Sequence, residues 1–172
     1  MKLYLPALLT ALFPYSLLAI FHCLFTGFLM ETVFRNNALF CLAALAVCFL
    51  IALVSVIVLC ILGCRASVPP DRRALLVMGI NLVQIPASAA LFVLGTLFLA
   101  TIFTIPFTLF IVFWDVVTII LSGAVGAVFL RKNYCSGCLN HTEWIVHTVL
   151  QFVFCADVVS TVIVFRKLKQ HL

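Results

Sequence analysis

Two aspartates stand inside long apolar runs of this chain and are the residues best suited to chemistry. Asp115 lies in "IVFWDVVTII" and Asp157 lies in "CADVVSTVIVF". An aspartate in the middle of a membrane helix costs roughly 2.5–3.5 kcal/mol on insertion scales, while each Leu, Ile, Phe or Val returns about 0.3–0.6 kcal/mol. The helices still insert, but we expect neither carboxylate to face lipid. Acids in this position mark proton, ion or solute sites in membrane proteins.

The second candidate site is the loop motif "YCSGCLNH", in which Cys135 and Cys138 have the C-x-x-C spacing of thiol redox pairs and of half a zinc site. His141 follows three residues later, and Cys64 reaches the same membrane face if the chain crosses five times. The four residues would then form a Cys3His zinc site that ties two loops together. A redox pair and idle, reduced thiols are the alternatives, and Cys64 also sits where juxtamembrane thiols are acylated.

The composition shows which solvent surrounds these residues. Of the 172 residues, 66% are hydrophobic and 9% are charged, and the mean hydropathy is +1.35. A water-soluble domain carries roughly 25% charged residues, so the solvent for most of this chain must be lipid. The net charge of +5 fits loops that meet anionic headgroups. Nucleic acid is not an expected partner, because no stacking aromatics accompany a basic patch outside the membrane.

Apolar runs of about 20 residues or more, the length that spans a hydrocarbon layer of roughly 30 Å, recur along the chain. Charges and turn residues separate them, and Pro106 suits the first turn of a helix. We predict an all-α, polytopic integral membrane helix bundle with about five transmembrane helices, short loops and no soluble domain, so that residues 1–172 form a single transmembrane domain. The predicted spans are residues 3–30, 38–63, 74–100, 105–130 and 143–165.

The basic residues give the orientation of such a bundle. Five crossings place six Lys and Arg residues on the face of the amino terminus and four on the other face. The positive-inside bias then favours a cytosolic amino terminus by a thin margin, in an integral protein of the plasma membrane. The three basic residues of the carboxyl tail argue the opposite. Either the orientation is reversed or the last segment does not cross.

Helical periodicity places polar residues on one stripe of each span except the second. If these stripes converge, polar groups are distributed across the whole membrane, as a proton or solute path requires. Such residues are also what membrane helices use to pack closely and to hydrogen-bond to one another. The candidate residues of this intramembrane polar site are Asp115, Asp157, His22, His147, Gln151, Asn81 and Gln84.

Three functions from different classes fit this pattern. The first is a small permease, channel or transport-system subunit with a polar interior centred on Asp115 and Asp157. The second is a non-catalytic membrane component that binds another membrane protein through the same stripes, and the third is a membrane thiol oxidoreductase that uses Cys135 and Cys138.

Several absences limit these functions. The sequence has no phosphate-binding loop, no nucleophile elbow and no loop long enough for a soluble active site. We therefore expect no enzyme outside thiol chemistry and no cofactor other than zinc. The small size and the lack of internal repeats favour a homo-oligomer or a subunit of a larger membrane complex.

Overall fold

The chain folds into a stack of helices, which the computed structural model describes for residues 3–26, 31–32, 34–35, 37–65, 69–100, 102–137, 139–153 and 156–170. All regular elements of these residues are helical. They are α1 (Tyr4–Thr26), α3 (Ala38–Arg65), α4 (Pro70–Phe98), the short 3-10 helix η1 (Ile102–Thr104), α5 (Ile105–Cys135), α6 (His141–Leu150) and α7 (Ala156–Gln170).

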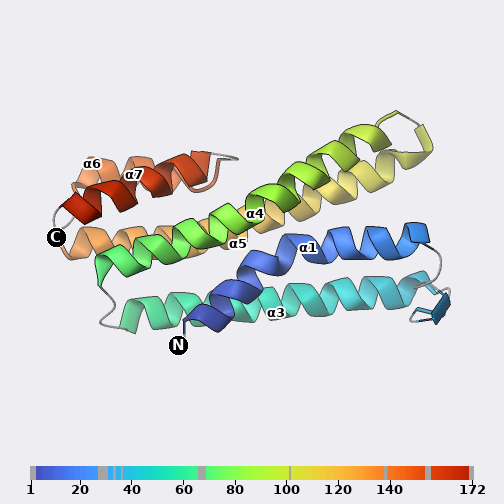
Figure 1. The fold of residues 1–172 in the computed structure, drawn as a ribbon, viewed down its shortest axis with the longest axis horizontal. Coiled ribbons are helices and arrows are strands. Elements are labelled where there is room, and N and C mark those ends of the chain that lie inside the picture. The colour runs from blue at the N-terminus through green and yellow to red at the C-terminus, as the bar shows by residue number, and fades with distance from the viewer. Residues whose placement is uncertain are drawn as a thin grey trace.

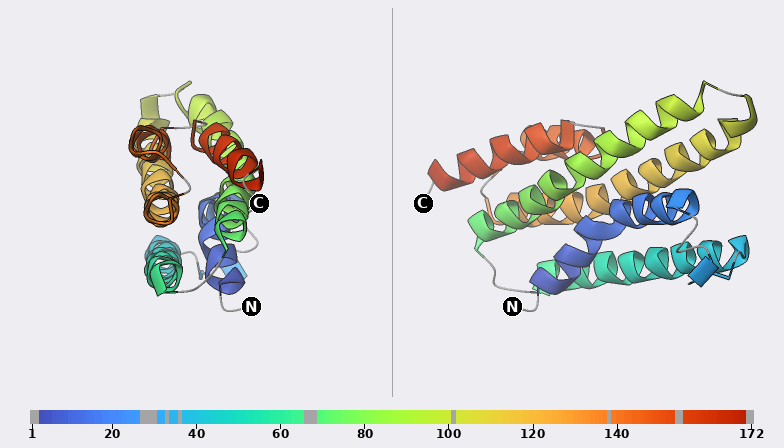
Figure 2. Two further views of the ribbon diagram at one scale, coloured as in Figure 1. Left: turned by 90° about the vertical axis from the view of Figure 1, so that its left-hand side faces the viewer. Right: turned by 45° about the vertical axis from the view of Figure 1, so that its right-hand side comes forward.

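The helices form three layers of two, made by α1 with α3, α4 with α5, and α6 with α7 (Figure 1). Viewed from one end, α1, α4 and α7 lie in one column and α3, α5 and α6 in the other (Figure 2). The middle layer therefore packs on both of the others. The third layer is short and covers only part of the α4–α5 surface (Figure 1).

Four helices are long and apolar enough to cross a membrane, which confirms the predicted helical membrane bundle. The candidate spans in the described residues are Tyr4–Thr26, Leu39–Cys64, Arg72–Phe98 and Ile105–Cys135. Proline sets two of the starts, because α4 begins at Pro70 and α5 carries Pro106 in its first turn, where the missing N–H costs nothing. These helices agree with the first four predicted spans.

The segment predicted as a fifth span, residues 143–165, differs from that prediction. It is divided between α6, with 10 residues, and α7, with 15 residues. At about 1.5 Å per residue neither helix reaches across a hydrocarbon layer of roughly 30 Å. α7 runs back toward the end at which α6 begins, so the two helices form a hairpin with its tip at residues 151–153 (Figure 1). The length and hydropathy of an apolar run do not distinguish one crossing from two short helices that fold back, because the turn of a fold-back is tolerated where neighbouring helices cover it.

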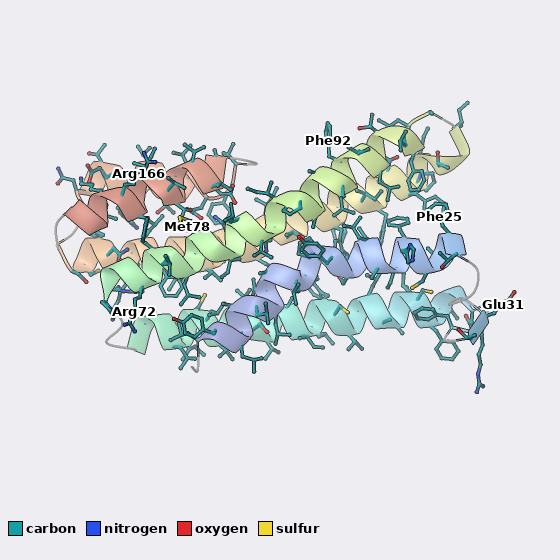
Figure 3. The ribbon with its side chains drawn as sticks, in the orientation of Figure 1. Phe25, Glu31, Arg72, Met78, Phe92 and Arg166 are labelled. Atoms are coloured by element: carbon teal, nitrogen blue, oxygen red, sulfur yellow. The ribbon has the colours of Figure 1, made fainter. Side chains whose placement is uncertain are left out.

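The hairpin changes the distribution of charge. Both chain ends and the α5–α6 connection now lie at one end of the bundle, where Figure 3 also shows Arg72 and Arg166, with Glu31 at the opposite end. Only Arg35 of the basic residues accompanies Glu31 there, and Lys2 precedes the described residues. The other eight basic residues belong to helix ends at the same end of the bundle as the chain termini. They are Arg65, Arg72, Arg73, Arg131, Lys132, Arg166, Lys167 and Lys169. The tail charges that argued against a cytosolic amino terminus now support it.

Apolar side chains pack between the first two layers, and they also line the cavities that remain there. Leu17, Leu59, Leu91 and Val125 come from the four spanning helices, and none is more than 1% exposed. The ring of Trp114 stacks on Phe13 with centroids 4.8 Å apart. In the described residues the centre of the four-helix bundle is therefore a hydrophobic core.

Candidate functional site

Asp115 lies in the membrane-spanning part of α5, between α5 and α4. Its side chain is half-buried, and the Ser88 hydroxyl of α4 donates a hydrogen bond to its Oδ1 over 3.2 Å. The α4 helix therefore supplies a polar neighbour at the depth of the carboxylate. A carboxylate accepts about four hydrogen bonds, so this single contact leaves most of its capacity unused.

Ser88 is also part of a groove of about 280 Å³ that runs between α4 and α5 and ends at the start of α7. Its apolar wall includes Ile85, Phe92 and Val93, which are 43%, 70% and 57% exposed. Because these side chains face the surroundings at membrane depth, the groove opens sideways toward the bilayer, and Phe92 points outward from α4 beyond the hairpin (Figure 3). The polar residues that line the groove are Asn81, Gln84, Ser88, Thr118, Ser122 and Asp157.

Asp157 stands at the hairpin end of this groove, in the first turn of α7. It is half-buried, and its Oδ1 accepts a hydrogen bond from the backbone N–H of Val158 over 2.7 Å. An acid is favourable there, because the first turn of a helix exposes N–H groups and the positive end of the helix dipole. The two predicted acids are thus associated with the same groove, Asp157 directly and Asp115 through Ser88.

A buried polar cluster fixes the hairpin beside the groove. The Thr161 hydroxyl of α7 accepts hydrogen bonds from Asn81 Nδ2 at 3.3 Å and from Gln151 Nε2 at 3.1 Å. It donates its own proton to the Asp157 carbonyl over 2.5 Å. Asn81 and Gln151 are 2% and 1% exposed. The hydroxyl therefore ties α4, the hairpin tip and α7 together.

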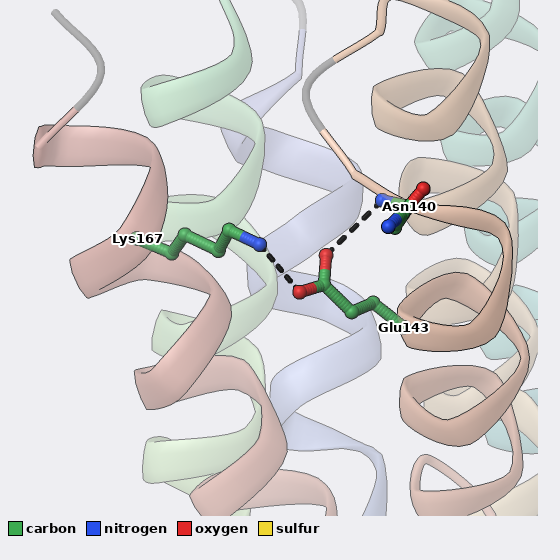
Figure 4. Close-up of polar contacts among 3 residues, drawn as sticks. All are labelled: Asn140, Glu143 and Lys167. Atoms are coloured by element: carbon green, nitrogen blue, oxygen red, sulfur yellow. Dashed lines mark hydrogen bonds and ion pairs between the residues drawn. The ribbon is translucent and has the colours of Figure 1, made fainter.

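His147 belongs to the same hairpin but not to the cluster around Thr161. Its Nδ1 lies 2.8 Å from the Ser160 hydroxyl of α7. Nearer the end of the bundle that carries most of the basic residues, Glu143 accepts two hydrogen bonds. The donors are the Asn140 backbone N–H at 3.0 Å and Lys167 Nζ at 2.5 Å (Figure 4). The Lys167 ammonium is the main cause that holds the pKa of Glu143 below its usual value, and the Asn140 N–H adds to it. Polar contacts thus join α6 and α7 along their length.

Two small residues of α5 allow the hairpin tip to approach. A Cβ at Gly126 would overlap the side-chain amide of Gln151, and one at Gly123 would come within 2.9 Å of the Phe152 ring. Membrane helices pack most closely where residues are small. The glycines of "SGAVGA" therefore act as a seat for residues 151 and 152.

The remaining polar predictions do not join this site. Gln84 lines the groove, but its amide donates across the bundle to the Thr10 carbonyl of α1 at 3.1 Å. His22 is exposed near the end of α1, away from the hairpin, so the predicted convergence of its stripe with the others does not occur. Tyr15 of α1 donates to the Val83 carbonyl of α4 at 2.8 Å. The stripes supply separate contacts between helices instead of one shared interior.

The predicted metal or thiol site is described only in part, because Cys138 lies outside the described residues. Cys64 and Cys135 are both exposed and unpaired with each other. Lys132 Nζ donates to the Cys64 carbonyl at 2.5 Å, and His141 packs edge-on against Tyr134. Among the described residues no group of three or more His, Cys, Asp or Glu could hold a metal ion. The zinc and redox readings of Cys135 and Cys138 stay predictions.

Sequence reasoning missed two buried polar residues near the hairpin. Asn133 of α5 and Ser160 of α7 are each 1% exposed. Asn133 follows Gly126 by seven residues, which places both on one helix face. That spacing could have identified Asn133, but the predicted span ended at residue 130 and left it in a loop.

Comparison with known proteins gives no family for this fold or site. No protein-family model, no curated protein and no solved structure matches the chain. Function must therefore be inferred from the site itself.

Proposed function

We propose that this protein is a non-catalytic membrane component that binds another membrane protein through the groove between α4 and α5. The observation that carries the proposal is the position of Asp157 and of the Ser88–Asp115 pair at a groove that opens to the bilayer. Polar and ionisable groups at membrane depth normally face protein or water. A transmembrane segment seated in the groove would cover both acids from the lipid side.

The arrangement of the layers supports the same function. The hairpin covers one part of the α4–α5 surface, and no described residue covers the remainder beyond its tip (Figure 1). Ile85, Phe92 and Val93 present apolar surface there. A partner helix would continue the third layer and would bury both the apolar wall and the acids, as the interior helices of a membrane complex do.

Transport through the bundle is less well supported than partner binding. A permease or channel needs polar groups in sequence across the membrane. Leu17, Leu59, Leu91 and Val125 are buried between the four spans. The cavity of about 550 Å³ that these spans enclose nearer the α4–α5 turn is lined almost wholly by apolar residues. Asp115 pairs with Ser88 of the middle layer, and Asp157 belongs to the hairpin layer outside it. Both acids therefore lie at the lateral groove and away from the interior of the four-helix bundle.

The proposal is tested by filling the groove. Ala89 lines it and is exposed, so Ala89→Trp inserts a large side chain without disturbing the core. Ala43→Trp is the matched control, because Ala43 is exposed on α3 and does not line the groove. A photo-reactive amino acid at position 85 should cross-link to one membrane protein in native membranes.

We expect Ala89→Trp to reduce that cross-link at least about tenfold, as loss of roughly 1.4 kcal/mol of binding would do, and Ala43→Trp to leave it unchanged. Both variants should be inserted to the same extent, which protease protection verifies. Equal cross-linking in the two variants, or the absence of a discrete cross-linked partner, would contradict the proposed function.

A further inference from the structure

We propose that the segment received by the groove carries a lysine or arginine near the middle of its membrane span, and that this cation pairs with Asp115 and Asp157. The inference rests on the proposed function and names the chemistry of the partner. It follows from the hydrogen bonds around the groove, the charges of this chain and the size of the cavity.

The hydroxyl and amide groups that line the groove already donate hydrogen bonds within the protein. The Ser88 hydroxyl donates to Asp115, and the Gln84 amide donates to the Thr10 carbonyl. The hydroxyls of Thr118 and Ser122 donate to carbonyls one turn earlier in α5. None of these hydroxyl protons points to an occupant.

The acceptors of the groove are under-used. Asn81 lines the groove, is 2% exposed, and its Oδ1 has no hydrogen-bond partner among the described residues. Each of the two aspartates has room for further donors beyond the contacts with Ser88 and Val158. A buried acceptor without a donor costs about 1–3 kcal/mol. A donor-rich cation is the group that such a set of acceptors recognises, since Lys offers three donors and Arg five.

A second copy of this chain cannot supply that cation. Every lysine and arginine of the four spanning helices lies in a terminal turn or near one, as with Arg72 and Arg73 of α4 and with Arg131 and Lys132 of α5. None lies at the depth of Asp115. The inference therefore requires a different chain, whose own basic residue would be as costly in lipid as the aspartates are. Pairing removes both penalties at once.

The volume and open shape of the groove favour a side chain of a partner helix over a free small molecule as its occupant. Sites for small molecules and cofactors usually enclose about 300–1,000 Å³ and bury most of the ligand. The groove, at about 280 Å³, is at the lower limit of this range and is open along one side. Such a shape suits one long side chain that enters from a helix lying on the surface.

The test uses designed transmembrane peptides of about 20 leucine and alanine residues with one central residue, which is Lys, Gln or Leu. The purified full-length protein is labelled on α5 and reconstituted with each peptide in phosphatidylcholine vesicles, and association is read by energy transfer. We expect the Lys peptide to associate about tenfold more tightly than the Leu peptide, which is the order of one charge-assisted hydrogen bond. The Gln peptide should resemble the Leu peptide.

The variants Asp115→Asn and Asp157→Asn keep the shape of each side chain and an acceptor for the Ser88 and Val158 contacts. We expect the double variant to lose the preference for lysine, while Ser55→Ala keeps it, because the Ser55 hydroxyl donates to the Ile51 carbonyl of its own helix, α3, and does not line the groove. The inference would be overturned if the Lys peptide bound no more tightly than the Leu peptide, or if the Gln peptide bound as tightly as the Lys peptide. A preference for lysine that survives in the double variant would also overturn it. Binding of butylammonium in place of the Lys peptide would also overturn it.

These outcomes are separate from those of the proposed function. Failure of the lysine preference, with the Ala89→Trp effect intact in native membranes, would reject the cation and keep the partner. Equal cross-linking of Ala89→Trp and Ala43→Trp would reject the partner whatever the peptides do.

Discussion

At the scale of single residues, the absence of a side chain at position 126 is as important as the polar groups around it. The Gln151 amide occupies the space where a Cβ of residue 126 would lie. From that position Gln151 donates a hydrogen bond to Thr161 at 3.1 Å. A small residue on one helix thus permits a buried hydrogen bond between two others.

We predict that Gly126→Ala weakens docking of the hairpin. The added methyl group must displace the Gln151 amide, and overpacking of this kind typically costs about 1–3 kcal/mol. Hydrogen exchange at the α6 amides should become faster and thermal unfolding in detergent should begin earlier. Gly79→Ala is the control, because a Cβ there meets nothing within 4 Å, and it should be neutral or stabilise by about 0.4–1 kcal/mol. If the two variants showed the same hydrogen exchange and the same thermal unfolding, close packing of the hairpin tip on the glycines of "SGAVGA" would be contradicted.

At the scale of elements, the hairpin is a pair of short helices that depends on contacts with its neighbours. Helices of this length are marginal in isolation, so their stability must come from packing and from polar ties. Glu143 of α6 and Lys167 of α7 form one such tie at 2.5 Å. Both side chains are 37% exposed, so solvent screens the pair and its contribution is small.

This tie should depend on pH in a defined direction. The pKa of Glu143 is lower in the folded protein than in the unfolded chain, chiefly because Lys167 donates to the carboxylate. Its contribution to stability is therefore complete above the unfolded value of about 4.3 and is lost as the pH falls through the lower folded value. We expect the difference in thermal midpoint between the native protein and Glu143→Gln to be constant near neutral pH and to vanish in acid. A difference that grows on acidification would contradict this assignment.

At the scale of the whole molecule, folding back of the hairpin places both chain ends on one face. Eight of the ten lysines and arginines lie in described helix ends on that face, and Arg35 lies on the other. The positive-inside bias counts residues close to the ends of spans, and it favours a cytosolic location for this face. Basic residues at that face also meet anionic headgroups, each with roughly 1 kcal/mol of attraction.

We predict that both termini are cytosolic. Glycosylation acceptors fused to either terminus should remain unmodified in a eukaryotic membrane, whereas an acceptor inserted between residues 31 and 37 should be glycosylated. Arg35→Ala should not change this pattern, because the charge difference between the faces increases. Modification of the carboxyl-terminal acceptor alone would show that residues 141–170 cross the membrane after all.

The amino-acid sequence by itself determined that this is a helical membrane protein with spans at α1, α3, α4 and α5. That information is local, because the length of each apolar run, the charges between runs and prolines such as Pro106 act within one segment. The sequence also singled out Asp115 and Asp157 as the acids inside apolar runs, since their cost in lipid depends only on depth. Only the tertiary structure decided that residues 143–165 turn back and that Asn81 and Gln151 meet at Thr161. It also placed the aspartates at a lateral groove, because which helix faces touch depends on packing between distant segments, including the close approach that Gly126 allows.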